Sequence, residues 1–95
     1  SHIYTNGGSM YVTYLFRRSK DPHQTLLRWK KLKTAASQQI VSMGGTITHQ
    51  HGIGLDHQPY LQQEKGALGT QILQNIIRTT DPNQVMNRGK LIDLD

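Results

Sequence analysis

The sequence predicts an α+β fold, in which an antiparallel sheet carries helices packed on one of its faces. Residues 9–18 and 44–54 have the composition of strands, whereas residues 22–43 and 67–80 show the apolar spacing of amphipathic helices. The 95 residues suffice for one domain with a modest core. A helix with one apolar stripe is well accommodated against a sheet, which is why we expect this two-layer arrangement.

The first predicted strand, residues 9–18, is rich in aromatic and β-branched side chains. Its apolar side chains alternate onto both faces, so we expect it to be covered on both sides, or on one side by a part of the protein outside this sequence. Upstream, Gly7 and Gly8 predict a turn that follows an extended segment at residues 2–4. His2 and Tyr4 would then point to the same side of that segment.

A long helix is expected from Pro22 to about Met43. Asp21 can cap its first amide groups, and Gly44 can end it. Lys33 falls inside the apolar stripe of this helix, where its methylene groups can cover apolar surface or its ammonium can face an anionic partner. The stripe that should pack on the sheet consists of Leu26, Trp29, Leu32, Ala36, Ile40 and Met43.

The second half of the chain is predicted to be mostly helical. Residues 55–60 form a polar connection, and a short helical turn follows until Gly66 interrupts it. Apolar residues with helical spacing then predict a second helix over residues 67–80. Pro82 ends this helix because the residue before a proline is pushed out of the helical region. Residues 84–92 are predicted to be a loop with a final apolar anchor.

Composition narrows the classes of function. The net charge of +5 comes largely from a basic stretch at residues 17–33. Its one aromatic residue, Trp29, falls in the apolar stripe of the predicted helix and does not suggest base stacking, so we expect a solvated helix face and no nucleic-acid partner. The chain has no cysteine, which fits a reducing compartment and a cytoplasmic location. No apolar run approaches the ~18 residues of a membrane span.

Residues 44–54 hold the candidate site. In a strand, His49 and His51 share one face, while Gln50 points to the other, and Gly52 allows close approach of a ligand. The two imidazoles could bind a metal with His57 or His2 as third ligand, could form structural hydrogen bonds, or could act in acid–base chemistry and substrate binding. The last reading is favoured, and no metal is expected.

Two stretches of the sequence resemble a known family. The first is Gly44-Gly45-Thr46-Ile47-Thr48-His49-Gln50-His51-Gly52-Ile53-Gly54, and the second is Asp81-Pro82-Asn83-Gln84-Val85-Met86-Asn87-Arg88-Gly89-Lys90-Leu91. They are similar to the histidine-rich stretch and the closing segment of the C-terminal domain of FAD-linked oxidases of the vanillyl-alcohol oxidase type. Within this family, the two stretches most resemble those of the alkyldihydroxyacetonephosphate synthases and of bacterial FAD-binding oxidoreductases like them.

The resemblance implies that residues 1–95 are a C-terminal substrate or cap domain fragment, the ferredoxin-like half of that domain, whose N-terminal FAD-binding domain lies outside this sequence and holds most of the FAD. It implies catalytic roles for His51, His49 and Tyr4. Cofactor contacts are implied for His51, Gly52 and Asn87, and substrate contacts for His2 and Gln50.

The implied function is that of an FAD-dependent oxidoreductase, in which this fragment covers the flavin and helps bind and deprotonate a small hydroxy acid or a similar substrate. One alternative is an alkylglycerone-phosphate synthase-like transferase, although Gln50 replaces the middle histidine of the family motif and cannot shuttle a proton at neutral pH. Another is a non-catalytic α+β binding or dimerisation module, with a homodimer covering the exposed apolar face. The fragment alone is expected to be inactive.

Overall fold

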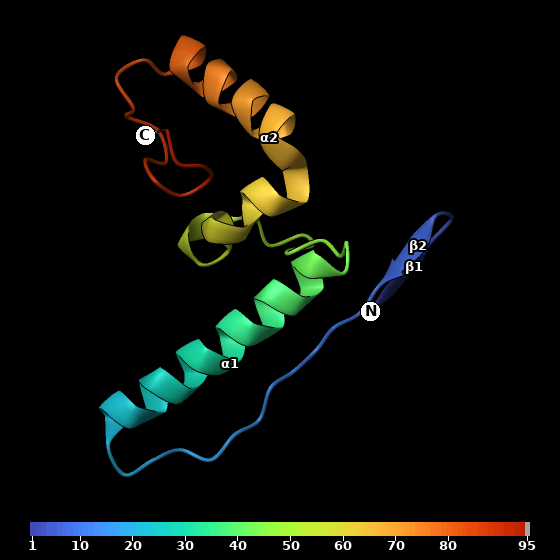
Figure 1. Ribbon diagram of the computed structural model, residues 1–95, viewed down its shortest axis with the longest axis vertical. Coiled ribbons are helices and arrows are strands. Elements are labelled where there is room, and N and C mark those ends of the chain that lie inside the picture. The colour runs from blue at the N-terminus through green and yellow to red at the C-terminus, as the bar shows by residue number, and fades with distance from the viewer. Residues whose placement is uncertain (95) are drawn as a thin grey trace. The chain divides into compact units, whose positions relative to one another are not determined.

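The computed structural model describes residues 1–94, and it contains two strands and two helices. Their order is β1 (His2–Tyr4), β2 (Gly7–Ser9), α1 (Pro22–Ser42) and α2 (Gly54–Thr80) (Figure 1). The chain divides into two compact units, Ser1–Leu32 and Lys33–Asp95, with the boundary inside α1. The predicted α+β class with an antiparallel sheet is confirmed, whereas the packing of the helices on one face of that sheet stays a prediction.

Strands β1 and β2 form an antiparallel hairpin, in which His2 is opposite Ser9 and Tyr4 is opposite Gly7. The extended segment at residues 2–4 is therefore confirmed, but the turn precedes Gly7 and is not made by the two glycines. Gly8 serves a different purpose: a Cβ atom there would lie 3.3 Å from the carbonyl oxygen of His2 on the opposite strand. Glycine thus allows close approach of the two backbones.

The strand predicted over residues 9–18 is wrong beyond Ser9, because residues 10–18 have no regular secondary structure. A strand requires a neighbour for its amide and carbonyl groups, and β-propensity reflects packing against such neighbours. Of residues 1–32, all of which the structure describes, none is buried. The large apolar side chains exposed in residues 10–16 are Met10, Tyr11, Val12, Tyr14, Leu15 and Phe16.

Helix α1 begins and ends as predicted. The Asp21 carboxylate accepts a hydrogen bond of 2.9 Å from the His23 amide, which is an N-cap. In the apolar stripe that should pack on a sheet, Trp29 and Leu32 are 39% and 38% exposed, so this packing stays a prediction. The buried residues of α1 are Ser37 and Val41, on another side of the helix.

Helix α2 starts earlier than predicted, so the expected polar connection at residues 55–60 is wrong. Ile53 already has helical backbone angles and its carbonyl accepts the amide of His57, while Asp56 places a negative charge in the first turn, where the helix dipole favours it. The predicted interruption at Gly66 is confirmed by its φ of 72° and ψ of 174°, which divide α2 into two helical halves. The helix ends at Thr80, before Pro82, as expected.

The core of the second unit is small. Its buried apolar residues are Val41, Ile47, Leu61 and Ile92, contributed by α1, the connection, α2 and the tail. Ile92 confirms the predicted apolar anchor of the tail, and the Gln74 side chain donates a hydrogen bond of 2.8 Å to the carbonyl of Asp93 beside it. None of the described helices is long and apolar enough to cross a membrane.

Leu61 is expected to be the most sensitive core position, because it is only 2% exposed. Replacing Leu61 with alanine should lower the free energy of unfolding by about 2–5 kcal/mol, measured by urea denaturation. Leu68→Ala is the matched control on the same helix, since Leu68 is 70% exposed and its loss should change stability by less than about 0.5 kcal/mol. Equal effects of the two substitutions would contradict this assignment of the core.

Candidate functional site

The candidate site lies in the connection between α1 and α2, residues 44–53, which we call the histidine loop. The strand predicted here is wrong: these residues form a loop without regular secondary structure. Gln50 and Gly52 have φ angles of 72° and 77°, so the backbone reverses repeatedly and the expected alternation of side chains between two faces does not occur. The loop holds its shape through contacts at three points.

The first point is the end of α1. The Gly45 amide donates to the Ile40 carbonyl at 2.9 Å and the Gly44 amide donates to the Val41 carbonyl at 3.0 Å, the hydrogen-bond pair of a Schellman motif. Gly44 has a φ of 78°, which glycine adopts without strain. A Cβ atom on Gly45 would lie 3.0 Å from the Ile40 carbonyl oxygen, so the loop leaves the helix in tight contact with its last turn.

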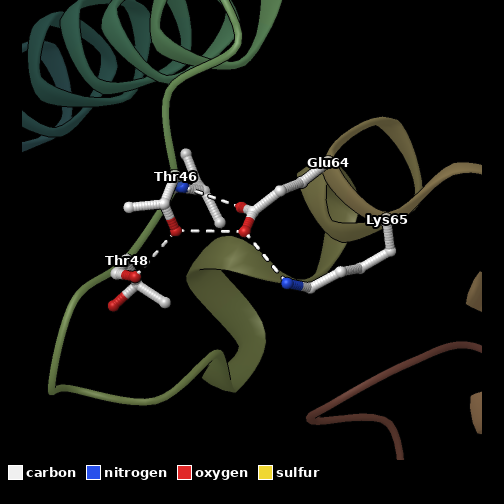
Figure 2. A network of polar contacts seen from close by, with 5 residues as sticks. Thr46, Thr48, Glu64 and Lys65 are labelled. Atoms are coloured by element: carbon white, nitrogen blue, oxygen red, sulfur yellow. Dashed lines mark hydrogen bonds and ion pairs between the residues drawn. The ribbon is translucent and has the colours of Figure 1, made fainter. Parts of the chain in front are cut away.

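The second point is Glu64, on the first half of α2. Its Oε2 atom accepts the backbone amide of Ile47 at 2.8 Å, and its Oε1 atom lies 3.0 Å from the Thr46 hydroxyl. Figure 2 shows this network, in which the same hydroxyl lies 3.1 Å from the Thr48 carbonyl oxygen and the Lys65 ammonium lies 3.3 Å from Glu64 Oε1. One carboxylate therefore connects α2 to two successive residues at the start of the loop.

The environment of Glu64 keeps it ionised. Burial raises the pKa of Glu64, but the hydrogen bonds from the Ile47 amide and the Thr46 hydroxyl, together with the hydrogen bond and charge of Lys65, lower it. The result lies below the ordinary value of 4.5. The Glu64 side chain is only 16% exposed, whereas Lys65 is half exposed and its ion pair is screened by solvent. The amide and hydroxyl donors therefore contribute more to the stability of the ionised carboxylate than Lys65 does.

The third point is the start of α2. Both the backbone amide and the Nδ1 atom of His57 contact the Ile53 carbonyl oxygen, at 3.3 and 3.0 Å. His57 is thus occupied with the backbone at the end of the loop, which is a structural role. Among residues 1–94, no three histidine, aspartate or glutamate side chains are arranged to hold a metal ion.

Between these points lie four of the predicted site residues. His49 is half-buried, whereas Gln50, His51 and Gly52 are exposed. A Cβ atom on Gly52 would meet no atom within 4 Å, so the space beside His51 is open to a planar group. The loop therefore exposes both an imidazole and an amide to solvent.

The other predicted residues lie elsewhere in the chain. His2 and Tyr4 are close to each other on β1, in residues 1–32, with ring centroids 6.3 Å apart. Asn87 lies in the tail, where it lines a cavity of about 440 Å³ together with the end of α2. The Asp81 carboxylate supports this part of the tail by accepting the amides of Val85 and Met86 at 3.0 and 2.8 Å.

Glu64 and the tail cavity were not identified as functional features from the sequence. A signal for Glu64 exists: it follows the buried Leu61 by three residues on the same helix, so it lies on a buried face, where a carboxylate needs a partner. No comparable signal indicates the cavity, which depends on how the tail folds back.

Comparison with known proteins gives consistent matches. Residues 1–91 match the family model described as "FAD linked oxidases, C-terminal domain". The chain is 46% identical over 85 residues to a mitochondrial D-lactate dehydrogenase (cytochrome) from Arabidopsis thaliana, which covers 90% of this chain and 15% of that protein. It is 27% identical over 92 residues to the alkyldihydroxyacetonephosphate synthase of Dictyostelium discoideum, covering 97% of this chain and 15% of that protein.

An uncharacterized FAD-linked oxidoreductase from Escherichia coli strain K12 is 27% identical over the whole chain and 20% of its own length. The chain thus spans only about a fifth or less of the curated relatives that it matches here. No solved structure gives a significant match.

The lowered pKa of Glu64 predicts a specific loss of stability in acid. The folded-state pKa lies below the unfolded value, so the ionised carboxylate contributes its full stabilisation above pH 4.5, and this contribution is lost as the pH falls through the folded-state pKa. The urea midpoint of the wild type should therefore fall below pH 4.5 more steeply than that of Glu64→Gln, which has no carboxylate to protonate. Parallel curves for the two proteins would contradict this prediction.

Proposed function

Because this chain belongs to the family of FAD-linked oxidase C-terminal domains, we propose that it is the C-terminal part of an FAD-dependent oxidoreductase. In this proposal, a longer polypeptide contributes an N-terminal domain that holds most of the FAD, and the present residues cover the flavin and handle the substrate. The predicted partner within the parent chain is therefore that N-terminal domain, as the family implies.

We further propose that the substrate is a small 2-hydroxy acid such as D-lactate. The observation that carries this choice is the 46% identity to a D-lactate dehydrogenase over 90% of the chain, compared with 27% to alkyldihydroxyacetonephosphate synthase. Gln50 is consistent with this choice, because its amide can donate a hydrogen bond to a carboxylate oxygen.

The residues of the histidine loop suit a flavin and a hydroxy acid. His51 is exposed beside the open space at Gly52, and His49 is partly covered by the loop. When bound, FAD supplies the hydride acceptor. His51 Nε2 or Nδ1 accepts the hydroxyl proton of the substrate as general base, since one ring nitrogen of a neutral imidazole is a proton acceptor. For His49, which is half-buried, a catalytic role beside His51 is implied by the family resemblance.

His2 and Tyr4 are proposed substrate contacts, with the Tyr4 hydroxyl as a second group able to exchange a proton, and Asn87 is a proposed cofactor contact. Each remains a prediction from the family resemblance. A cytoplasmic location and a homodimer are likewise predictions, to be tested by cell fractionation and by light scattering of the purified protein.

The proposed function predicts a flavin spectrum in the full-length parent enzyme. Mixing with D-lactate or other D-2-hydroxy acids under anaerobic conditions should bleach the flavin absorbance, because no acceptor reoxidises the cofactor. Flavin bands that persist while a phosphorylated glycerone ester is consumed would instead support the synthase-like alternative. A protein without any flavin would contradict both and leave the binding-module alternative.

The role of His51 predicts a large kinetic defect. His51→Asn should lower the rate of anaerobic flavin reduction by about 10²- to 10⁴-fold, because asparagine cannot accept the hydroxyl proton. His23→Asn is a control, since His23 is an exposed residue in the first turn of α1. A reduction rate of His51→Asn equal to that of the wild type would assign the proton to another group.

A further inference from the structure

Glu64 stands out among the polar groups that the proposed chemistry does not use. Its side chain is 16% exposed, and it belongs to the first half of α2 and not to the histidine loop. Both of its carboxylate oxygens are directed at the start of the loop, one at the Ile47 amide and one at the Thr46 hydroxyl (Figure 2). A group that only needed solvation or a surface ion pair would not require this arrangement.

The start of the loop is fixed at Ile47 both by its side chain and by its backbone. The side chain of Ile47 is 8% exposed and packs in the core, while its backbone amide is fixed by the carboxylate at 2.8 Å. His49 follows only two residues later, so the position of the backbone at Ile47 limits where the side chains of His49 and His51 can lie. The Schellman motif before Thr46 and the Ile53 contact with His57 fix the two ends of the loop.

We propose that Glu64 is the positioning residue of the site: by holding Thr46 and Ile47 against α2, it sets the position of His49 and His51 for proton transfer. This inference rests on the proposed oxidoreductase function. Lys65 is not required for it, because that side chain is half exposed and adjacent to Glu64 on the same helix. The hydrogen-bonding geometry of Glu64, and not its charge, carries the role.

A pair of variants separates geometry from charge. In Glu64→Gln, the amide oxygen can still accept the Ile47 amide, and the amide nitrogen can donate to the Thr46 hydroxyl, which then donates to the Thr48 carbonyl. In Glu64→Ala, both contacts are lost and the amide of Ile47 has no acceptor in α2. Gln63→Ala is the matched control, because Gln63 is an exposed neighbour on the same helix.

The experiment uses the full-length enzyme loaded with FAD, and the rate of anaerobic flavin reduction is measured per bound flavin across a range of pH. Glu64→Ala should reduce this rate at least about tenfold and alter its pH profile, since a displacement of catalytic groups of about 1 Å can cost up to 10²-fold. Glu64→Gln should recover most of the rate, and Gln63→Ala should match the wild type.

Hydrogen exchange of peptides covering residues 44–54 gives a second readout that does not depend on catalysis. Exchange should be about tenfold faster in Glu64→Ala, because a hydrogen bond to a buried carboxylate is lost, and it should be near the wild-type rate in Glu64→Gln.

The results distinguish a failure of the positioning role of Glu64 from a failure of the proposed oxidoreductase function. A wild-type reduction rate in Glu64→Ala, or equally low rates in the alanine and glutamine variants, would overturn the positioning role, the second because charge would then be responsible. Unchanged exchange of the loop in Glu64→Ala would overturn it as well. A wild-type protein without flavin would instead refute the proposed function, while faster loop exchange in Glu64→Ala would still establish Glu64 as the anchor of the loop.

Discussion

The histidine loop depends on one carboxylate placed at the margin of a small core. The histidine loop has left-handed residues at Gln50 and Gly52, and regular secondary structure does not hold it. Glu64 compensates by accepting a backbone amide and a side-chain hydroxyl from successive residues. Because its two oxygens contact successive residues, a single side chain can order a segment that carries exposed imidazoles.

Local signals in the sequence predict the helices well. The cap at Asp21, the glycine pair after α1, the break at Gly66 and the stop before Pro82 each depend on the chemistry of one or two residues, and the structure contains all of them. The same reasoning fails for residues 10–18, because a strand exists only with a neighbour that the local sequence does not contain. It also fails for the histidine loop, where the positive φ of Gln50 cannot be expected of a non-glycine residue.

The candidate site was predicted in composition but not in architecture. His49, His51 and Gly52 were expected on a strand but lie in a loop, and the support that Glu64 provides comes from a residue fifteen positions after His49, so periodicity along the loop does not reveal it. The exposure of apolar side chains in residues 1–32 has a related origin. The local sequence gives several of these side chains high β-propensity, yet none of residues 1–32 is buried.

The break at Gly66 separates two structural roles of α2, support of the histidine loop and contacts with the tail. The half before it carries Glu64 and supports the loop, whereas the half after it carries the groups that hold the tail, such as Gln74 and Arg78. The backbone at Gly66 is not helical, and the Thr70 hydroxyl donates a hydrogen bond of 2.8 Å to its carbonyl oxygen. The two halves of α2 can therefore run in different directions on either side of the glycine (Figure 1). One continuous stretch of sequence thus forms two short supports, one for the loop that carries the imidazoles and one for the polar contacts of the tail.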